Sequence, residues 1–495
     1  MRSSVLAAAG RAVRNGRNWR LCCSLIVAGA LAGCGGGSNR PAQRRPVAAP
    51  YLGAVVSPEP IAGEVAREIL AEGGNAADAA TALGFALAVS LPSRAGLGGG
   101  GACLAYDPSP KAPGGGRPEA ILFLPAAPKG GAGGDRPAAV PMLVRGLYLL
   151  HARYGRLPIQ QLVGVAQKMA RLGIHVSPEL AADIAAVAGP LLADPAARAV
   201  FASPSGAPLI AGEGLFQPDL ANTLSQLRLN GLRDFYQGSL ARRLAQGALE
   251  AGGGLTEADF AQAVPSLAQP IELRAGINRV AFLPAPADGG LAAAAAFTEL
   301  RKDPADLAQA AERALAVAAR WRAGGVSGTA LLTEKNLPPA NLPPLPASTA
   351  FATLDSGGEA VACAVTMNNL FGTGRIAPGT GVLLAAAPTT APLPLLSAAI
   401  AWNHNIHAFR AAVASSGQNA AAIATALGMA DALRSKTLGP VSVPQPGAAQ
   451  VISCGRFLPG NAASCAAVTV PPGGGYAFSG SYGTPAAGGT PAAGS

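Results

Sequence analysis

Ser348 has the residue type and the surroundings of an N-terminal nucleophile. This small hydroxyl residue stands at the head of a strand-like run, directly after a segment suited to cleavage. Once the Ala347–Ser348 bond is cut, the new α-amino group can act as the base for its own hydroxyl, which then attacks an acyl carbon. Thr349 is the neighbouring alternative, but it would place the hydroxyl on the opposite face of the strand. An ordinary loop serine is the structural alternative for Ser348.

An exposed lead-in and two short strands must position Ser348. The lead-in, residues 337–347 (LPPANLPPLPA), is crowded with proline, which favours an extended chain. Residues 351–354 and 360–366 have strand character, and the DSGGE turn between them predicts a hairpin. Ser348 is therefore expected where the first strand of this hairpin begins.

The composition indicates a large globular protein rather than a nucleic-acid binder. The chain has 495 residues, 50% hydrophobic and 13% charged, which suffices for two or three domain-sized units or one composite core. Its net charge is +10, but residues 1–45 hold eight arginines and no acid, so the rest carries only +2. No basic stripe interleaved with aromatic residues is present, which argues against nucleic-acid binding.

The N-terminal arginines belong to an expected export signal. Five of them precede the uncharged run 21–32, namely Arg2, Arg11, Arg14, Arg17 and Arg20. This run is too short to span a membrane and leads into LAGC, ending at Cys34. LAGC looks like a bacterial lipobox, so residues 1–33 are expected to be a lipoprotein signal peptide and Cys34 to be lipidated. Residues 34–50 would be a flexible linker, and the lipid would tether the protein to an envelope membrane, expected to be the outer one, facing the periplasm. A plain signal peptide or a mistaken start codon is the alternative.

Cysteine and histidine spacing predicts a disulfide but no metal site. Cys454 and Cys465 flank the loop GRFLPGNAAS and can close a disulfide in an oxidising compartment. Cys103 and Cys363 lie in apolar runs and are expected to be buried thiols. The four histidines show no metal-ligand spacing. No metal and no cofactor is therefore expected.

A glycine run and a low-complexity tail are the remaining features. The run at residues 95–101 (AGLGGGG) has no GKS or GKT, so we expect close backbone packing rather than phosphate binding. Asn75 is expected to cap a deeply buried helix. The last 24 residues are low in complexity and are expected to be disordered.

Several stretches, in their order along the chain, resemble the γ-glutamyltransferase (glutathione hydrolase) family. EILAEGGNAADAATALGFALAVSLPSRAGLGGGGACLAY at residues 68–106 resembles the start of the large subunit. TMNNLFGTG at residues 366–374 resembles the start of the small subunit, with Ser348 at the position of the family's nucleophilic threonine. The likeness covers about residues 51–430. The division implied is a large-subunit-like region (51–347), a small-subunit-like region (348–470) and a tail (471–495).

The resemblance implies a fold and a reaction. The fold is α+β, with the four αββα layers of N-terminal nucleophile hydrolases and two antiparallel sheets between helical layers. The reaction is self-cleavage before Ser348, then attack on an amide or peptide substrate through an acyl-enzyme. The two fragments of a cut chain are expected to stay associated.

The resemblance also assigns supporting roles. Thr366 matches a threonine that hydrogen-bonds the nucleophile, and Asn368 matches an asparagine that lines the glutamyl pocket. Gly417 matches the first of two glycines whose backbone N–H groups hold the oxyanion, and Gln418 stands in place of the second. Cross-strand pairing, turn capping and a turn glycine are the structural alternatives for Thr366, Asn368 and Gly417, respectively.

The residues that would bind a γ-glutamyl group are largely replaced. Leu124 stands where the family has an arginine for the substrate carboxylate, and Thr390 where it has an aspartate for the amino group. Leu396 replaces the first of two serines, and Ser397 keeps the second. Each lost charged contact is worth about 2–5 kcal/mol. The sequence thus predicts an acyl-transfer enzyme with an altered pocket, and the alternative is an inactive relative acting as a binding or structural envelope lipoprotein.

Overall fold

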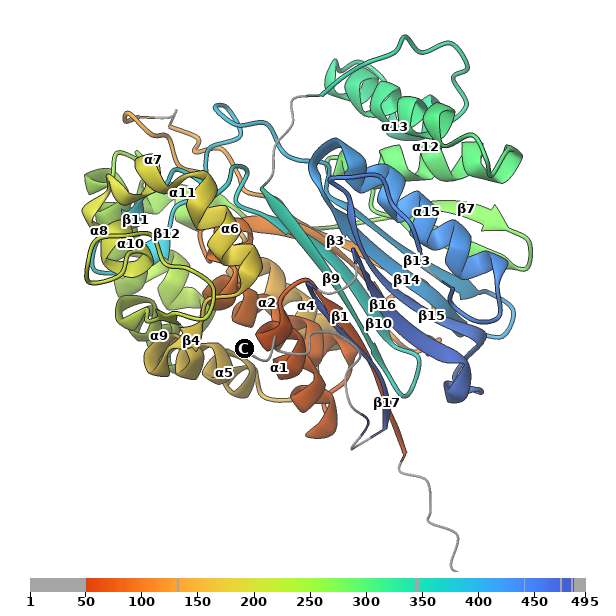
Figure 1. Cartoon of the computed structure of the whole chain (residues 1–495), viewed down its shortest axis with the longest axis horizontal. Coiled ribbons are helices and arrows are strands. Elements are labelled where there is room, and N and C mark those ends of the chain that lie inside the picture. Colours follow the sequence, from red (N-terminus) through yellow and green to blue (C-terminus); the bar gives the residue numbers. More distant parts are fainter. Residues whose placement is uncertain are drawn as a thin grey trace, which may run out of the picture. The chain divides into compact units, whose positions relative to one another are not determined.

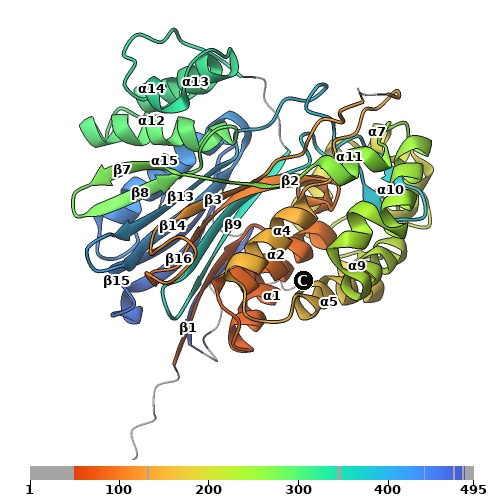
Figure 2. The same ribbon diagram turned by 180° about the vertical axis from the view of Figure 1, so that it is seen from behind.

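Two antiparallel β-sheets pack face to face between layers of helices (Figures 1 and 2). The structure, a computed structural model, describes residues 50–130, 133–342, 347–439, 441–471, 474–481 and 484. The expected signal peptide, the Cys34 lipidation site and nearly all of the linker lie outside the described residues.

The larger sheet combines strands from both ends of the chain in the order β17–β1–β9–β10–β2–β3–β6, and every neighbouring pair is antiparallel. Its strands, in that order, are Tyr476–Ser481, Tyr51–Ser57, Ser348–Asp355, Ala360–Thr366, Gly100–Tyr106, Glu119–Phe123 and Ser266–Ala268. The hairpin expected after Ser348 is therefore β9–β10, in the middle of this sheet.

The smaller sheet has the order β16–β15–β14–β13–β8–β7 and is also antiparallel throughout. Its strands, in that order, are Cys465–Val470, Ala448–Leu458, Ala408–Ser416, Ser397–Asn403, Asn278–Phe282 and Ile271–Ala275. Two short ribbons pair β4 (Ile174–His175) with β5 (Gly214–Leu215) and β11 (Ile376–Ala377) with β12 (Val382–Leu383).

Helices cover the outer face of each sheet (Figure 1). On the larger sheet's side are α1 (Pro60–Ala71), α2 (Ala76–Ser90), α3 (Pro92–Ala95), α4 (Leu143–Tyr154), α5 (Ile159–Leu172), α6 (Pro178–Ala186), α7 (Ala188–Leu192), α8 (Pro195–Phe201), α9 (Pro218–Gln237), α10 (Ser239–Glu250) and α11 (Glu257–Gln262). On the smaller sheet's side are α12 (Asp288–Lys302), α13 (Leu307–Arg322), α14 (Gly328–Leu331) and α15 (Ala421–Arg434). The short 3₁₀ turns are η1 (Gln418–Ala420) and η2 (Ala462–Ser464).

The helix α2 shows how composition sets the layering. All 15 of its residues are buried, which matches a sequence whose only charged member is Asp78. Asn75 caps its first turn, because the Asn75 side chain accepts from the Asp78 N–H and the Asp78 carboxylate accepts from the Asn75 N–H. The expected cap and the deep burial are therefore both confirmed.

Alternation along β9 decides which side chains face the second sheet. Ala350, Ala352 and Leu354 belong to the hydrophobic cluster between the sheets, whereas Phe351 packs in the cluster under the helices. Ser348 has the same parity as Ala350, so its side chain belongs to the inter-sheet face. Thr349 has the opposite parity and faces the helices, as expected.

The glycine run packs closely against neighbouring backbone, as expected. A Cβ atom added at Gly98, Gly99, Gly100 or Gly101 would lie only 2.2, 2.3, 2.3 or 2.4 Å, respectively, from a carbonyl oxygen of an adjacent segment. Such distances exclude any side chain. The run therefore lets β2 and the loop before it approach β10 and β3.

The expected disorder of the tail is wrong for its first part. Tyr476–Ser481 forms β17, which pairs with β1 at the edge of the larger sheet. The alternating Tyr476 and Phe478 bury their rings in the cluster under the helices, which compensates for the glycine-rich flanks. Most of the remaining tail lies outside the described residues.

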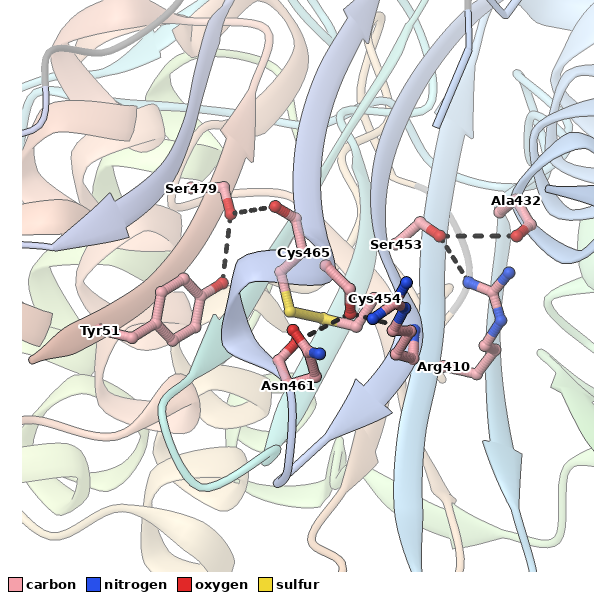
Figure 3. Close-up of a disulfide and its surroundings, with 10 residues drawn as sticks. Tyr51, Arg410, Ala432, Ser453, Cys454, Asn461, Cys465 and Ser479 are labelled. Carbon is pink, nitrogen blue, oxygen red and sulfur yellow. Dashed lines mark hydrogen bonds between the residues drawn. A yellow bond between two sulfur atoms is a disulfide. The ribbon is translucent and has the colours of Figure 1, made fainter. Parts of the chain in front are cut away.

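The expectation of two buried thiols is also wrong. Cys103 of β2 and Cys363 of β10 are directly opposite in the antiparallel register and form a disulfide. Cys454 and Cys465, at the β15–β16 turn, form the second disulfide, beside Ser479, whose hydroxyl donates to the Cys465 carbonyl (Figure 3).

Within the described residues, no helix is both long and apolar enough to cross a bilayer.

Candidate active site

Ser348 occupies the first position of β9, opposite Thr366 of β10, which is in turn opposite Gly100 of β2. The spacing of the two hydroxyl residues in the sequence thus becomes direct cross-strand contact. In the uncut chain Ser348 is buried, and its hydroxyl has no hydrogen-bond partner among the described residues. No side-chain base among the described residues therefore hydrogen-bonds this hydroxyl.

The carbonyl oxygen of Ala347, on the bond before Ser348, accepts two hydrogen bonds. The Thr366 hydroxyl donates to it at 2.6 Å, and the Met367 N–H donates at 3.3 Å. The Asn368 N–H donates to the Thr366 Oγ at 2.8 Å, so the proton of that hydroxyl is directed at the Ala347 oxygen. Two donors at one carbonyl oxygen are the arrangement that stabilises an oxyanion.

This contact differs from the role that the resemblance implied for Thr366. In the uncut chain the Thr366 hydroxyl bonds the Ala347 carbonyl and not the Ser348 hydroxyl. The reason is geometric: the peptide group that precedes Ser348 occupies the space beside Thr366. The sequence did not reveal the Met367 N–H, although it lies within TMNNLFGTG.

Asn368 links the end of β10 to a neighbouring segment. Its backbone is left-handed (φ 62°), and its side-chain NH₂ donates to the Ala386 carbonyl at 2.9 Å. The side chain is fully buried, and its oxygen has no hydrogen-bond partner among the described residues. Asn368 thus holds the segment that contains Ala386 through its NH₂ group. Its side-chain oxygen remains close to the site as a hydrogen-bond acceptor without a partner among the described residues.

The Gly417–Gln418 turn lies between β14 and α15. Gly417 has φ 108°, and an added Cβ would lie 2.3 Å from the Pro446 oxygen, so only glycine fits. Gln418 keeps a left-handed backbone (φ 59°) despite its side chain. The side-chain NH₂ of the next residue, Asn419, donates to the Leu342 carbonyl at 2.6 Å, so the turn contacts the lead-in to Ser348.

Leu124 lies at the same end of the strands of the larger sheet as Ser348. The preceding residue, Phe123, pairs with Gly101, which aligns Leu124 with Gly100 and hence with Thr366 and Ser348. Leu124 packs against the inter-sheet cluster, so it shares the face of Ser348. Strands are about 4.8 Å apart, which puts Leu124 three strands, or about 14 Å, from Ser348.

The other predicted pocket residues separate into two places. Leu396 packs between the sheets, whereas Ser397, at the start of β13, has the opposite parity and faces the helices. Ser397 is buried and its hydroxyl has no partner among the described residues. Thr390 is exposed, and its hydroxyl donates to the Ala387 carbonyl at 3.0 Å.

A cleft of about 380 Å³ adjoins this site. Its lining comes from the loop after TMNN, from α7 and from two other segments: Asp135, Arg136, Pro137, Val187, Pro190, Leu191, Asn369, Leu370, Phe371, Gly372, Thr373, Gly374, Ala386, Thr390 and Ala391. Ala386 connects the cleft to the site, because its carbonyl holds Asn368 and its N–H donates to the Met367 carbonyl. Sequence reasoning found Thr390 but missed Arg136, which no motif marks.

The carboxylate of Asp135, in the cleft lining, is paired with an arginine outside the lining. Arg375 forms a two-pronged ion pair with Asp135 (2.8 Å for both contacts) and also donates to the Ala251 carbonyl. This pairing holds the pKa of the Asp135 carboxyl below its usual range. Among the described residues, no cluster of three or more histidine, cysteine or acidic side chains could hold a metal ion.

The fold and the position of Ser348 define the class of protein: an α+β, four-layer N-terminal nucleophile hydrolase fold. Cephalosporin acylase from Bacillus halodurans has the same architecture, with a TM-score of 0.65 at 20% identity over 85% of this chain and 95% of that chain. The γ-glutamyltranspeptidase of Helicobacter pylori aligns with a TM-score of 0.50 at 25% identity over 55% of this chain and 86% of that chain.

The family model for gamma-glutamyltranspeptidase matches residues 62–313, half of the chain, and the chain belongs to this family. The "Glutathione hydrolase proenzyme" of Bacillus subtilis strain 168 is 34% identical over 257 residues, 48% of this chain and 43% of that protein. The proenzyme of Escherichia coli K12 is 29% identical over 386 residues, 67% of this chain and 65% of that protein. The chain thus matches less than two thirds of either relative's length, and the family-model match ends before Ser348.

Proposed function

We propose that this protein is an N-terminal nucleophile amide hydrolase or acyltransferase that cuts itself between Ala347 and Ser348 and then uses Ser348 through an acyl-enzyme. The observation that carries the proposal is the pair of donors, Thr366 hydroxyl and Met367 N–H, on the Ala347 oxygen. Such donors polarise this one carbonyl and favour attack on it by the adjacent Ser348 hydroxyl.

The proposed self-cleavage has two steps. The Ser348 Oγ bonds to the Ala347 carbonyl carbon, the C–N bond breaks, and the hydroxyl proton ends on the Ser348 nitrogen. The negative charge of the intermediate rests on the Ala347 oxygen, between the Thr366 and Met367 donors. Water then hydrolyses the ester, which restores the Ser348 hydroxyl and leaves a carboxylate on Ala347.

Acyl transfer uses the groups that cleavage releases. The Ser348 α-amine takes the hydroxyl proton as the oxygen attacks the substrate carbonyl, and it passes this proton to the amine part of the substrate, which departs. Water or an acceptor amine then takes the acyl group and restores the Ser348 hydroxyl. Thr366 is then free to bond Ser348, because the Ala347 carbonyl no longer occupies its hydroxyl. Backbone N–H groups of the Gly417–Gln418 turn are the proposed donors to the substrate oxyanion.

The substrate is a γ-glutamyl compound or a related amide, with the pocket favouring the latter. Leu124, which stands where the resemblance expects an arginine, lies on the same face of the larger sheet and at the same strand ends as Ser348. Leu396 packs between the sheets. Neither leucine can pair with a carboxylate, and Thr390 cannot supply a negative charge for an ammonium group. All three replacements favour an acyl group other than the zwitterionic glutamyl group.

The two fragments of a cut chain are expected to remain together. In the larger sheet, β9 from the second fragment lies between β1 from the first and β10 from the second, and β2 from the first follows β10. The Cys103–Cys363 disulfide joins β2 to β10 across the cleavage point. Separation would break three strand pairings of the larger sheet (β17–β1, β1–β9 and β10–β2) and the β13–β8 pairing of the smaller sheet, and it requires reduction of this bond.

The proposed location is the bacterial envelope, with a lipid on Cys34 tethering the protein to the outer membrane on its periplasmic side. The two disulfides support an oxidising compartment. Mass analysis of the protein extracted from membranes tests the anchor: diacylglyceryl modification of a chain starting at Cys34 is expected, and a Cys34→Ser variant recovered in the same lipidated form would contradict it.

Burst kinetics test the catalytic proposal. Incubation with a small 4-nitrophenyl acyl ester should release a burst of nitrophenolate equal to the amount of cut protein, and the acyl group should be found on Ser348. Ser348→Ala should show no burst, whereas Thr349→Ala, a matched change one residue along β9 and on its other face, should retain it. A cut protein that shows no burst, or labelling elsewhere, contradicts the proposal.

The second candidate function is a catalytically inactive relative with a binding or structural role in the envelope. The buried Ser348 hydroxyl without a partner, together with Leu124 and Leu396, favours it. In that case the wild-type chain stays uncut and gives no burst, and its properties match those of Ser348→Ala.

A further inference from the structure

Arg322, the last residue of α13, joins a buried carboxylate to the segment that leads into β13. Its Nε and Nη2 donate to the two carboxylate oxygens of Asp288, and Nη2 also donates to the Leu393 carbonyl at 2.8 Å. The Asp288 side chain is only 2% exposed, and that of Arg322 is 23% exposed. Charged hydrogen bonds in such surroundings are screened less than those at the surface.

The positions of the two charges at helix ends do not explain the third contact. Asp288 begins α12 and Arg322 ends α13, where an acid and a base, respectively, interact favourably with the helix dipoles. Neither dipole requires the bond from Arg322 to Leu393, which lies 71 positions further along the chain. The ion pair therefore connects the ends of two helices to residues 393–396.

The first turn of α12 also packs directly on this segment. A Cβ added at Gly289 would lie 2.5 Å from the Leu395 carbonyl carbon and 2.5 Å from the Leu396 oxygen, so no side chain fits there. Leu396 packs between the sheets, on the face to which Ser348 belongs. Asp288 and Gly289 thus fix residues 393–396 from one helix end, the first through Arg322 and the second by close approach.

The turn proposed to hold the substrate oxyanion meets the same segment. Arg322, Leu393, Leu395 and Gln418 all line one cavity of about 10 Å³. Because such a space holds at most about one water molecule, the turn and the segment are closely packed. Gln418 has a left-handed backbone (φ 59°), a conformation that persists in a residue with a side chain only when its surroundings hold it.

We propose that Arg322 and Asp288 are positioning residues for acyl transfer. By holding residues 393–396 against Gln418, they fix the left-handed turn whose backbone N–H groups are the proposed donors to the substrate oxyanion. The proposed self-cleavage uses two other donors, both from the end of β10, and neither is a hydrogen-bond partner of the pair. This inference rests on the proposed function and adds residues that act on acyl transfer but not on self-cleavage.

The rates of the two reactions test the inference. For Arg322→Gln we expect the burst with the 4-nitrophenyl ester to slow by about 10–100-fold. The loss should lie in the limiting rate rather than in KM, because a misplaced oxyanion donor affects the transition state and not ester binding. Self-cleavage should stay within about twofold of the wild-type rate, because its own donors are unchanged. Arg322→Lys, which keeps the charge, should restore part of the burst rate.

Matched variants separate the ion pair from a general effect of substitution. Arg320→Gln is the same change two residues earlier in α13, where the side chain donates to the Gly324 carbonyl, and it should keep the wild-type burst rate. Asp288→Asn should slow the burst as Arg322→Gln does, and the double variant should be little slower than the slower single one, because both changes remove one interaction.

Three kinetic results would overturn the inference. The first is a wild-type burst rate for Arg322→Gln in a protein that cuts itself. The second is equal slowing of burst and self-cleavage by Arg322→Gln, which would indicate a general structural effect. The third is full additivity of Arg322→Gln and Asp288→Asn, which would show that the two side chains act independently.

Hydrogen exchange keeps the inference testable if the catalytic proposal fails. In the uncut Ser348→Ala chain, Arg322→Gln should speed amide exchange in residues 388–397 and 417–421 but not in the β9–β10 hairpin, and Arg320→Gln should change neither. If wild type cuts itself and gives a burst that Arg322→Gln does not slow, only this inference fails. If wild type neither cuts itself nor reacts while exchange responds as expected, the catalytic proposal fails and the positioning of the turn stands. Unchanged exchange, or equal acceleration in the hairpin, overturns the inference in either case.

Discussion

Thr366 is the residue whose hydroxyl donates to the carbonyl of Ala347, on the bond for which we propose self-cleavage. It accepts from the Asn368 N–H and donates to the Ala347 oxygen, so its proton has one direction. A threonine that only paired across strands would not need its hydroxyl to donate in this one direction. Its role in self-cleavage can therefore be separated from its role in packing.

Removing this hydroxyl should slow self-cleavage. For Thr366→Ala we expect a rate about 10²–10³-fold lower, because one of the two donors to the developing oxyanion is lost. Thr366→Ser keeps the donor and should cleave at close to the wild-type rate. The rates are measured by the appearance of two bands on a reducing denaturing gel, and a Thr366→Ala chain that cleaves as fast as Thr366→Ser would contradict the role.

Residue positions within one hairpin could be predicted from the sequence, but contacts between distant segments could not. The family resemblance implied that Thr366 lies beside Ser348, and the register of the expected hairpin places the two residues opposite each other. The positions of Leu124 and Arg136 depend on how β3 and the loop after it pack against segments more than 200 residues away. No local pattern encodes that packing.

The β9–β10 hairpin is fixed to α2 at its far end by a buried carboxyl. Glu359 accepts from the Asn75 side chain (2.9 Å), from the Ala77 N–H (3.3 Å) and from Arg156 (3.4 Å). Burial raises the pKa of Glu359 to about 9, and the charge of Asp355 adds to the effect. The hairpin that carries Ser348 is thus coupled to protonation at its opposite end.

This coupling predicts a pH-dependent stability. Because the folded pKa of Glu359 is above its unfolded value, its stabilising contribution is full below about pH 4.5 and is lost as pH rises through about 9. In the uncut Ser348→Ala background, Glu359→Gln should make the fall in unfolding free energy between pH 6 and 9 shallower, by at most about 1.4 kcal/mol per pH unit. Urea unfolding at several pH values measures this, with the exposed Glu312→Gln as control. Parallel slopes for the two variants would contradict the assignment.

The Cys103–Cys363 disulfide could not be predicted from the strands taken one at a time. Each cysteine was assigned correctly to a buried strand, but the pairing of β2 with β10 brings together residues 260 positions apart. Cys454 and Cys465, separated by 11 positions at a turn, could be paired from their spacing alone. The difference is that the second pair is local and the first depends on the strand order.

Loop length should set the effect of each disulfide in the uncut chain. In the Ser348→Ala background, replacing Cys103 and Cys363 by alanine should lower the free energy of unfolding by on the order of 2–3 kcal/mol more than replacing Cys454 and Cys465. The longer loop restricts the unfolded chain more strongly. Urea unfolding compares the two double variants, and an equal or reversed ranking would contradict this account of their contribution.

At the scale of the whole molecule, the proposed cleavage point lies within a sheet that combines strands from before and after it. Strands β1, β2, β3 and β6 precede the Ala347–Ser348 bond, and β9, β10 and β17 follow it. The four-layer architecture was predictable from the family resemblance, because its motifs appear in order. The pairing of β17 with β1 was not, because its glycine-rich sequence lacks a strong strand pattern.

Intact mass with and without reductant is the most direct test of self-cleavage. Wild-type protein is expected to be heavier than its precursor by one water molecule before reduction, because the Cys103–Cys363 bond joins the fragments. After reduction it should give two chains that end at Ala347 and begin at Ser348, while Ser348→Ala gives one chain in both conditions. A wild-type protein that remains one uncut chain after reduction, with the mass of its precursor, would contradict the central claim.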